Sequence, residues 1–202
     1  SLETAYNHII HDKAVIFNKY KVRISGSSLV FLEANGAVHK IEYTNFVKEK
    51  IPWLGQPSFI LECSGKNTVK ADCDIYLQGD TKKVIISATS WDPEKTLIYG
   101  FNHHEYDDDQ NIISYGSCTV NAYVPLANYL HKMYGILDSD VNVIHNIQEY
   151  RLADNDTLIR KFCTLEKSGP NLLNFLSEDN FKVNYTVVPY TGVSILDFRF
   201  RL

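Results

Sequence analysis

The chain has 202 residues, 45% of them hydrophobic and 12% aromatic, so it can bury a sizeable core. Its formal net charge of −4 gives no general attraction to nucleic acid or to an anionic membrane surface. No apolar run is long enough to span a bilayer, and no basic start precedes an apolar segment, so nothing argues for secretion or insertion. We expect a cytoplasmic protein without a nucleic-acid or membrane partner.

The first half of the chain predicts a helix followed by β structure and then a strand–helix–strand unit. Residues 2–8 read as the tail of a helix, and residues 20–43 as strands joined by turns at Ser25–Ser28 and Asn35–Gly36. A short buried strand is expected at Phe59–Cys63, a helix between Val69 and Leu77, and an apolar strand at Lys82–Ala88. Strand, helix and strand in this order indicate an α/β fold with parallel strands.

The second half predicts one long helix between strands. Apolar side chains recur every three or four residues after Cys118, and Gly135 is placed to end that helix. The β-branched run Val141–Ile147 alternates like a half-buried strand, as does the segment Leu196–Leu202.

The four cysteines show no metal-ligand spacing, so reduced thiols and no metal site are expected. We expect Cys63, on a strand, and Cys73, on the apolar face of a helix, to be core residues. The adjacent His103 and His104 are expected on an extended segment, where neighbouring side chains point to opposite faces and do not favour a shared metal ion.

Cys118 is the candidate nucleophile, because a small-residue turn delivers it to the first turn of the expected helix. Unpaired backbone N–H groups and the positive end of the helix dipole favour a thiolate there. His145 lies twenty-seven residues further on, in the β-branched strand, and a neutral imidazole could take the thiol proton. Spacing alone leaves open whether the two side chains contact each other and form a catalytic site, or whether each is only a packing residue.

Five motifs occur in an order that is specific as a set: Glu62-Cys63-Ser64-Gly65; Lys83-Val84-Ile85-Ile86-Ser87-Ala88; Tyr99-Gly100-Phe101-Asn102-His103 with Tyr106-Asp107; Ser117-Cys118-Thr119-Val120-Asn121; and Val143-Ile144-His145-Asn146-Ile147. Through them, residues 62–151 resemble the phosphorylating glyceraldehyde-3-phosphate dehydrogenase family. Weaker similarity extends back to about Leu2 and forward to Val188–Ser194.

The resemblance implies an α/β fold in two parts. Residues 1–116 would be the remainder of a Rossmann-like, parallel-sheet NAD-binding domain, and residues 117–202 part of an α+β catalytic domain with a mainly antiparallel sheet. Because the chain starts at Ser1 and stops within a strand pattern, we expect the family's first phosphate loop before Ser1 and its last strands after Leu202. The resemblance also implies NAD as cofactor and a homo-oligomer, a tetramer in the family.

The resemblance further implies that the protein oxidises a small aldehyde. Cys118 would form a thiohemiacetal and then a thioester that inorganic phosphate cleaves, with His145 as the base. Ser117 and Thr119 would hold the attacking phosphate. Three residues would lie at the cofactor: Ser64, Gly65 and Thr89.

Two departures from the family pattern concern the substrate's phosphate. Gln148 stands where the family has a threonine, and Val187 where it has an arginine, so a phosphorylated triose is disfavoured unless a cation such as Arg151, Arg160 or Lys161 compensates. A non-catalytic binding or assembly module that keeps the fold is therefore an alternative. A third hypothesis is acyl transfer or ester hydrolysis by Cys118 and His145 without a cofactor.

Overall fold

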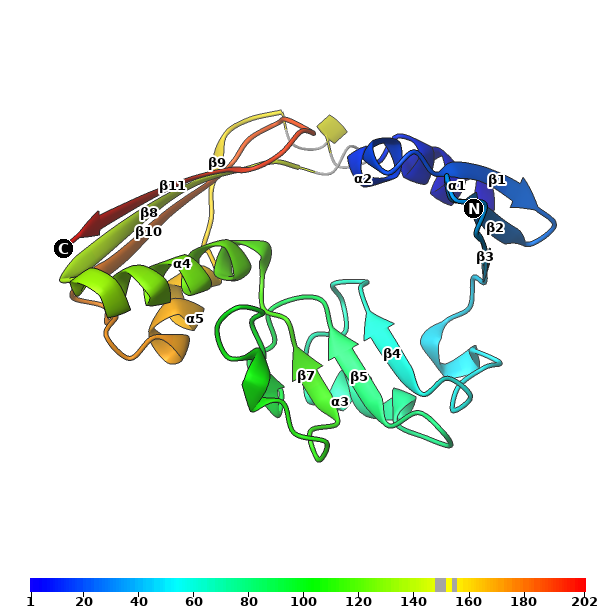
Figure 1. The fold of residues 1–202 in the computed structure, drawn as a ribbon, viewed down its shortest axis with the longest axis horizontal. Helices are drawn as coiled ribbons and strands as arrows, with labels where there is room; N and C mark the ends of the chain where they lie inside the picture. The colour runs from blue at the N-terminus through cyan, green and yellow to red at the C-terminus, as the bar shows by residue number, and fades with distance from the viewer. Residues whose placement is uncertain (148–151, 154–155) are drawn as a thin grey trace. The chain divides into compact units, whose positions relative to one another are not determined.

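The computed structural model describes residues 1–147, 152–153 and 156–202. They divide into two compact units, Ser1–Pro52 and Trp53–Leu202, and each is described by itself below. Figure 1 shows the elements with the labels used from here on.

The first unit joins two helices to an antiparallel sheet. Helix α1 (Leu2–Ile10) begins at Ser1, whose Oγ accepts a hydrogen bond from the Thr4 N–H at 3.2 Å, and α2 spans Lys13–Phe17. The sheet follows in the order β1-β2-β3, with the bounds Lys21–Ser25, Ser28–Leu32 and Val38–Glu42. Gly26 and Gly36 occupy the two expected turns with φ of +61° and +87°, where glycine avoids the strain of a side chain. The predicted helix and hairpins are confirmed. A 3-10 turn, η1 (Lys48–Lys50), follows.

The second unit begins with a four-stranded parallel sheet in the order β4-β5-β7-β6. The strands span Phe59–Glu62, Lys83–Ile86, Ile112–Ser114 and Lys95–Thr96 in that order. Between β4 and β5 lie α3 (Lys70–Cys73) and the 3-10 turn η2 (Asp74–Tyr76), and η3 (His103–Glu105) precedes β7. The arrows of β4, β5 and β7 point the same way in Figure 1, as the sequence predicted for a parallel sheet.

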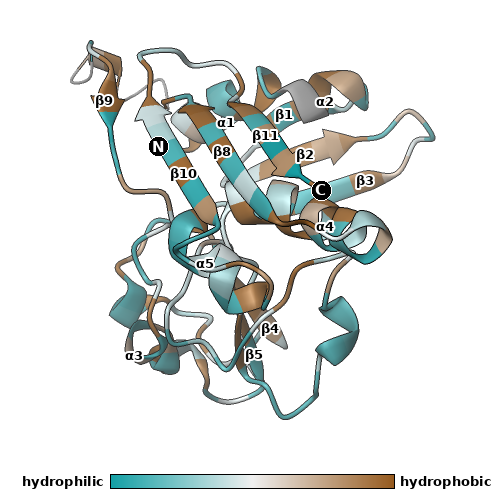
Figure 2. Cartoon of the chain, turned by 90° about the vertical axis from the view of Figure 1, so that its left-hand side faces the viewer, coloured by the Kyte–Doolittle hydropathy of each residue, from teal (hydrophilic) through white to brown (hydrophobic). Residues whose placement is uncertain are grey.

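The second sheet of this unit has the order β11-β8-β10-β9. Its strands span Ile195–Arg201, Asp138–His145, Phe181–Val187 and Ile159–Arg160 in that order. The β8–β10 pair is parallel and the other two pairs are antiparallel, so the sheet is mixed. Helices α4 (Cys118–Tyr134) and α5 (Leu165–Leu172) lie on one face of it (Figure 1). Polar and apolar residues alternate along β8, β10 and β11 in Figure 2, as expected for strands with one covered face.

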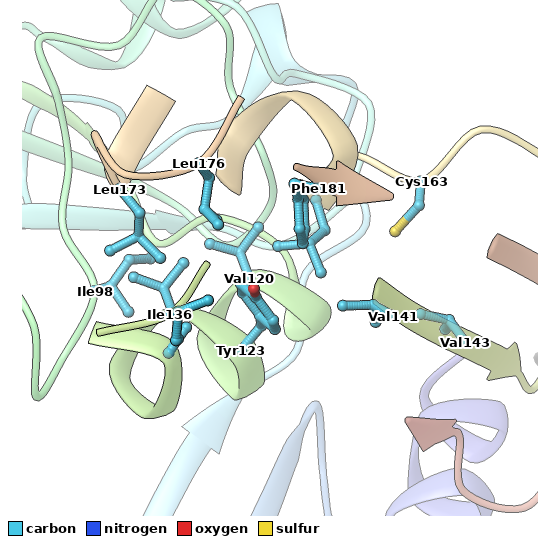
Figure 3. Close-up of a cluster of buried hydrophobic side chains, with 13 residues drawn as sticks. Ile98, Val120, Tyr123, Ile136, Val141, Val143, Cys163, Leu173, Leu176 and Phe181 are labelled. Atoms are coloured by element: carbon cyan, nitrogen blue, oxygen red, sulfur yellow. The ribbon is translucent and has the colours of Figure 1, made fainter. Parts of the chain in front are cut away.

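The main core lies between α4, α5 and the inner face of the mixed sheet. Tyr123 is fully buried, and its ring packs against those of Phe181, Phe198 and Phe200 at centroid distances of 5.2 to 5.7 Å. Figure 3 shows this cluster, in which Val120 and Tyr123 of α4 meet Val141 of β8. Burial of α4 on this sheet fixes the start of the helix and therefore the position of Cys118.

The fold class is confirmed: a Rossmann-like parallel sheet with helices is followed by a mixed sheet with two antiparallel pairings. The chain passes from one sheet to the other between the end of β7 at Ser114 and the start of β8 at Asp138. The division into domains at residues 1–116 and 117–202 stays a prediction.

Three local expectations were wrong. Cys63 is exposed rather than in the core, and Phe59 and Leu61 of β4 are also exposed, because the face of the strand that carries them is not covered in the described structure. His103 and His104 lie in the turn η3 and not on an extended segment. The turn is closed by a hydrogen bond from the Glu105 N–H to the Asn102 carbonyl at 2.9 Å. The side chain of the buried Asn102 fixes the preceding segment, since it accepts from the Ile98 N–H at 2.7 Å and donates to the Thr96 carbonyl at 2.9 Å. Cys73 is fully buried, as predicted.

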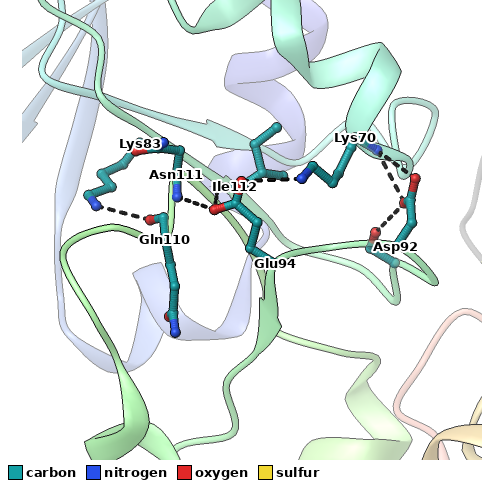
Figure 4. A network of polar contacts seen from close by, with 8 residues as sticks. Lys70, Lys83, Asp92, Glu94, Gln110, Asn111 and Ile112 are labelled. Atoms are coloured by element: carbon teal, nitrogen blue, oxygen red, sulfur yellow. Dashed lines mark hydrogen bonds and ion pairs between the residues drawn. The ribbon is translucent and has the colours of Figure 1, made fainter.

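A polar network fixes the loop that follows β5 (Figure 4). Asp92 accepts the Lys70 backbone N–H at 3.2 Å. Glu94 accepts from the Lys70 ammonium at 3.3 Å through one oxygen and from the Asn111 and Ile112 backbone N–H groups through the other. The loop is thereby tied to the start of α3 and to the start of β7.

Candidate active site

The turn before α4 determines where Cys118 lies. Gly116 has φ of +70°, and a Cβ there would stand 3.1 Å from Ile98 Cδ1 and 3.2 Å from Val120 Cγ1. Ser117 then caps the helix, because its Oγ accepts the Val120 N–H at 3.3 Å. Cys118 is the first residue of α4 and is exposed, so its thiol is accessible at the positive end of the helix dipole.

Two polar side chains hold this turn in place. The fully buried Ser114 donates through Oγ to the Ala88 carbonyl at 2.7 Å and accepts the Gly116 N–H at 2.9 Å. Asn121 donates through Nδ2 to the carbonyls of Tyr115 and Ser117 at 2.7 and 2.9 Å. The ends of β5 and β7 are thus connected to the start of α4 by hydrogen bonds.

The structure brings Cys118 and His145 together. His145 is the last residue of β8, and its Nε2 lies 3.6 Å from the Cys118 Sγ. Its Nδ1 lies 2.7 Å from the Asn146 carbonyl oxygen, which can only accept. Nδ1 therefore carries the proton, and Nε2 is free to accept the proton of the thiol.

Asn146 is in turn fixed by the loop that precedes β11. Its Oδ1 accepts from the Ser194 hydroxyl at 2.9 Å, and its Nδ2 donates to the Gly192 carbonyl at 2.7 Å. This anchor holds the carbonyl that orients the His145 ring. Sequence reasoning missed Asn146 and Ser194 as site residues, since a separation of 48 positions leaves no local pattern.

Ser117 and Thr119 lie side by side with their hydroxyl oxygens 2.9 Å apart. Thr119 is only 3% exposed, and its Oγ1 is 3.7 Å from the sulfur of Cys163. Cys163 is itself buried in the core cluster. Burial raises the pKa of the Cys163 thiol, in spite of hydrogen bonds from the Leu165 N–H and Thr119 that favour its ionised form, so the thiol stays protonated near neutral pH.

Tyr185 is another neighbour of Cys118 and His145 that sequence reasoning missed. It lies on β10, and its ring centroid is 5.3 Å from that of His145. Burial, together with the nearby sulfurs of Cys163 and Cys118, raises the pKa of the Tyr185 hydroxyl to about 12. The phenol is therefore neutral at physiological pH. Only the alternation along β10 could have indicated that this side chain faces inward.

The three expected cofactor residues follow the carboxyl ends of the adjacent parallel strands β4 and β5, the edge at which ligands bind open α/β sheets. The Ser64 N–H donates to the buried Glu62 carboxylate at 2.7 Å. Gly65 has φ of +69° and open space where a Cβ would stand. The Thr89 hydroxyl is buried and has no partner in the described part of the chain.

Thr89, Trp91, Gly116 and Ser168 share the lining of a cavity of about 360 Å³ at this edge. The cavity extends from the loop after β5 to α5 and reaches the turn that precedes Cys118.

Of the three cations expected to compensate for the missing phosphate contacts, the structure describes Arg160 and Lys161. The Lys161 backbone N–H donates to the Tyr185 carbonyl at 3.0 Å. Gln148 and Arg151 lie outside the described residues. Arg160 donates through Nη2 to Asn184 at 2.9 Å, on the face of β10 opposite to Tyr185. Val187 is buried and lies opposite His145 in the β8–β10 pairing.

In the ranges 1–147, 152–153 and 156–202, no three His, Cys, Asp or Glu side chains are placed to hold a metal ion. Within the same ranges, none of the helices is long and apolar enough to cross a membrane.

No family model matches the chain. Glyceraldehyde-3-phosphate dehydrogenase of Lactobacillus delbrueckii subsp. bulgaricus is 34% identical over 128 residues, which are 62% of this chain and 37% of that protein. The enzyme of Mycobacterium leprae is 41% identical over 106 residues, or 52% of this chain and 31% of the relative. The cytosolic enzyme of Sinapis alba is 40% identical over 100 residues, which are 49% of this chain and 29% of that protein.

The matched segments span about a third of the length of these relatives. Over the part of the chain that these matches cover, the chain is similar to glyceraldehyde-3-phosphate dehydrogenases, which is consistent with a member of that family.

Proposed function

We propose that the protein oxidises an aldehyde through a covalent intermediate on Cys118, with NAD as hydride acceptor and phosphate as acyl acceptor. The observation that carries this proposal is the 3.6 Å approach of the His145 Nε2 to the Cys118 Sγ. A thiol at a helix N-terminus beside a neutral, oriented imidazole is an activated nucleophile.

The first step forms a bond between sulfur and the carbonyl carbon. His145 Nε2 takes the thiol proton, the thiolate attacks, and the electron pair of the carbonyl double bond moves to oxygen. The backbone N–H of Cys118 would stabilise that oxyanion, which then receives the proton from His145 and becomes the hydroxyl of a thiohemiacetal.

The second step removes a hydride from carbon and a proton from the hydroxyl of the thiohemiacetal. NAD, held by the residues assigned to it below, would supply the hydride acceptor. His145 takes the hydroxyl proton again, and the carbonyl of a thioester forms on Cys118. Phosphate then attacks the thioester, the carbon–sulfur bond breaks, and Cys118 leaves as a thiolate. We assign the orientation of phosphate to Ser117 and Thr119, whose paired hydroxyls lie next to Cys118.

Three features fit a cofactor at the carboxyl end of the parallel sheet. The Thr89 hydroxyl is buried without a partner in the described residues, so it has a hydrogen bond to give to a bound group. Gly65 leaves open space beside the backbone, where a ribose or phosphate could approach closely. Ser64 lies beside Gly65 on the same loop. We assign these three residues to NAD.

We further propose a homo-oligomer that acts in the cytoplasm on a small aldehyde. The Sinapis alba relative is a cytosolic enzyme, which supports this location. The family resemblance supports self-association. Neither proposal depends on the geometry of the Cys118 site.

The test is formation of NADH from NAD and an aldehyde panel, with and without phosphate. The wild-type protein should reduce NAD in a phosphate-stimulated reaction, and Cys118→Ser should abolish it. Cys63→Ser is the matched control, because Cys63 is an exposed thiol at the end of β4 and should leave the rate unchanged. No reduction of NAD by any aldehyde would favour the alternative of a non-catalytic binding or assembly module.

A further inference from the structure

The imidazole of His145 needs more than its hydrogen bond at Nδ1 to keep its orientation. The Asn146 carbonyl, 2.7 Å from Nδ1, fixes one edge of the ring, and the Val188 N–H fixes the backbone by donating to the His145 carbonyl at 2.9 Å. The χ2 torsion of a histidine has broad minima, so packing against the ring decides how steadily Nε2 points at Cys118. A side chain that packs there is therefore part of the geometry of the site.

Tyr185 is such a side chain. The centroids of its ring and of the His145 ring lie 5.3 Å apart, with 40° between the ring planes, a separation typical of aromatic pairs. Tyr185 lies on β10 two residues before Val187, which pairs with His145 in the β8–β10 register. Residues two apart on a strand share a face, so the two rings are diagonal neighbours on one face of the sheet.

The surrounding structure holds Tyr185 in place on both sides. Strand β10 lies between β8 and β9, and the Lys161 N–H donates to the Tyr185 carbonyl at 3.0 Å. The ring of Tyr185 packs against the core cluster, to which Val143 and Cys163 belong. Because backbone and ring are both fixed, moving the ring away from His145 would disturb the core.

We propose that Tyr185 is a positioning residue, whose ring packs against the His145 imidazole and keeps Nε2 directed at the Cys118 thiol. This inference rests on the proposed function, because it takes His145 to be the group that activates Cys118. Tyr185 acts here through His145 and transfers no proton. Its phenol is neutral at physiological pH, so it places no negative charge beside the Cys118 thiolate.

The experiment measures the rate at which iodoacetamide alkylates Cys118, with the exposed Cys63 of the same molecule as internal reference. Tyr185→Leu removes the aromatic ring, whereas Tyr185→Phe keeps it. We expect Tyr185→Leu to slow alkylation of Cys118 by about three- to tenfold, the usual contribution of an aromatic pair, and Tyr185→Phe to stay within about twofold of wild type. Equal slowing in both variants would show that the hydroxyl acts rather than the ring, and would overturn the inference.

A double-mutant cycle separates an effect through His145 from general damage to the site. In the His145→Asn protein, Tyr185→Leu should slow alkylation of Cys118 no further, because no imidazole remains to be positioned. The same slowing in both backgrounds would mean that Tyr185 affects Cys118 by another route, and the inference would be wrong.

Phe181→Leu is the matched control. Phe181 lies on the same face of β10 as Tyr185, but its ring packs against Tyr123 at 5.2 Å rather than against His145. This substitution also replaces a packed aromatic ring by leucine, and it should leave the alkylation rate of Cys118 unchanged. If it slows Cys118 as much as Tyr185→Leu does, the effect comes from loss of packing in the sheet and contradicts the inference.

The wild-type protein offers a test that does not depend on the folding of any variant. Nuclear Overhauser effects between the ring protons of Tyr185 and those of His145 are expected, and their absence would overturn the inference. If His145→Asn leaves the alkylation of Cys118 unchanged, the proposed function fails together with the inference. If His145→Asn slows alkylation but Tyr185→Leu does not, the inference alone fails.

Discussion

His145 is the residue on which the proposed chemistry depends most directly. Its Nδ1 is held by the Asn146 carbonyl, so its Nε2 can act as base toward Cys118. We predict that His145→Asn lowers kcat for aldehyde oxidation by about 100-fold or more, the usual contribution of a general base. The exposed His104 provides the control, since His104→Asn should keep the wild-type rate. A wild-type kcat in His145→Asn, measured by NADH formation, would remove His145 from the mechanism.

Glu62 links stability to pH at the end of β4. It is 6% exposed and accepts hydrogen bonds from the Ser64 N–H at 2.7 Å, Asn67 Nδ2 at 2.8 Å and the Tyr76 hydroxyl at 3.0 Å. Burial alone raises the pKa of this carboxyl, but the hydrogen bonds outweigh burial and leave the pKa below its ordinary value. The native state thus favours the ionised form. The resulting stability is present above the pKa of the unfolded chain and is lost as pH falls through the lower pKa of the folded protein.

The substitution Glu62→Gln tests this pH dependence. We predict that it lowers the free energy of unfolding by about 1–3 kcal/mol near neutral pH, the cost of disturbing a buried, hydrogen-bonded polar group. The difference from wild type should shrink as pH falls below about 4, where the wild-type carboxyl protonates as well. Urea unfolding at a series of pH values measures it. A difference that is constant from neutral pH to pH 3 would show that the carboxylate charge is not the stabilising feature.

Among the elements, the turn between β7 and α4 determines the position of the Cys118 thiol. Gly116→Ala should lower the free energy of unfolding by about 2–3 kcal/mol. The backbone at this position is left-handed, which strains any residue with a Cβ, and the added Cβ would crowd the side chains of Ile98 and Val120. It should also slow alkylation of Cys118, since the start of α4 must shift. Gly135, at the other end of α4, has φ of +74° and open space at its Cβ position.

Gly135→Ala is therefore the matched control for Gly116→Ala. It should cost about 1 kcal/mol, from the backbone conformation alone, and leave the reactivity of Cys118 unchanged. Chemical denaturation and mass-resolved alkylation of both variants provide the comparison. Equal effects on Cys118 would mean that the turn at Gly116 does not position the thiol.

The elements that the sequence predicted are those with strong local patterns. Helix α4 was predictable from its apolar spacing and from Gly135, and β8 from its β-branched alternation. Helix α5 was not predicted, because Gly169 and Pro170 within it resemble a loop signal. At the site, sequence motifs indicated Cys118 and His145. The contacts of Tyr185 with His145 and of Cys163 with Thr119 were not predictable, since they join segments that are distant in the chain.

At the scale of the whole molecule, the two compact units differ in how much core they bury. In Ser1–Pro52, the buried hydrophobic residues among those described are Leu29 and Val30 of β2. In Trp53–Leu202, α4 and the mixed sheet bury a cluster around Tyr123. Stability scales with buried apolar area, so the first unit should open at a lower free energy than the second.

Native-state hydrogen exchange tests this difference. The central strand β2 of the first unit should exchange about tenfold faster or more than Val141 and Val143 of β8, after correction for intrinsic rates. Exchange of both strands at one rate, with the same dependence on denaturant, would show that the chain unfolds as a single unit and would contradict the division at Pro52.

The most direct test of the central claim, a Cys118 thiol activated by His145, is the rate of iodoacetamide alkylation at each cysteine, resolved by mass. We predict that Cys118 reacts first, that His145→Asn slows its alkylation by about tenfold or more, and that the exposed Cys63 keeps the same rate in both proteins. Added NAD should change the rate at Cys118 alone. If Cys118 and Cys63 react alike and His145→Asn changes neither, the 3.6 Å contact is packing and the site is not a catalytic one.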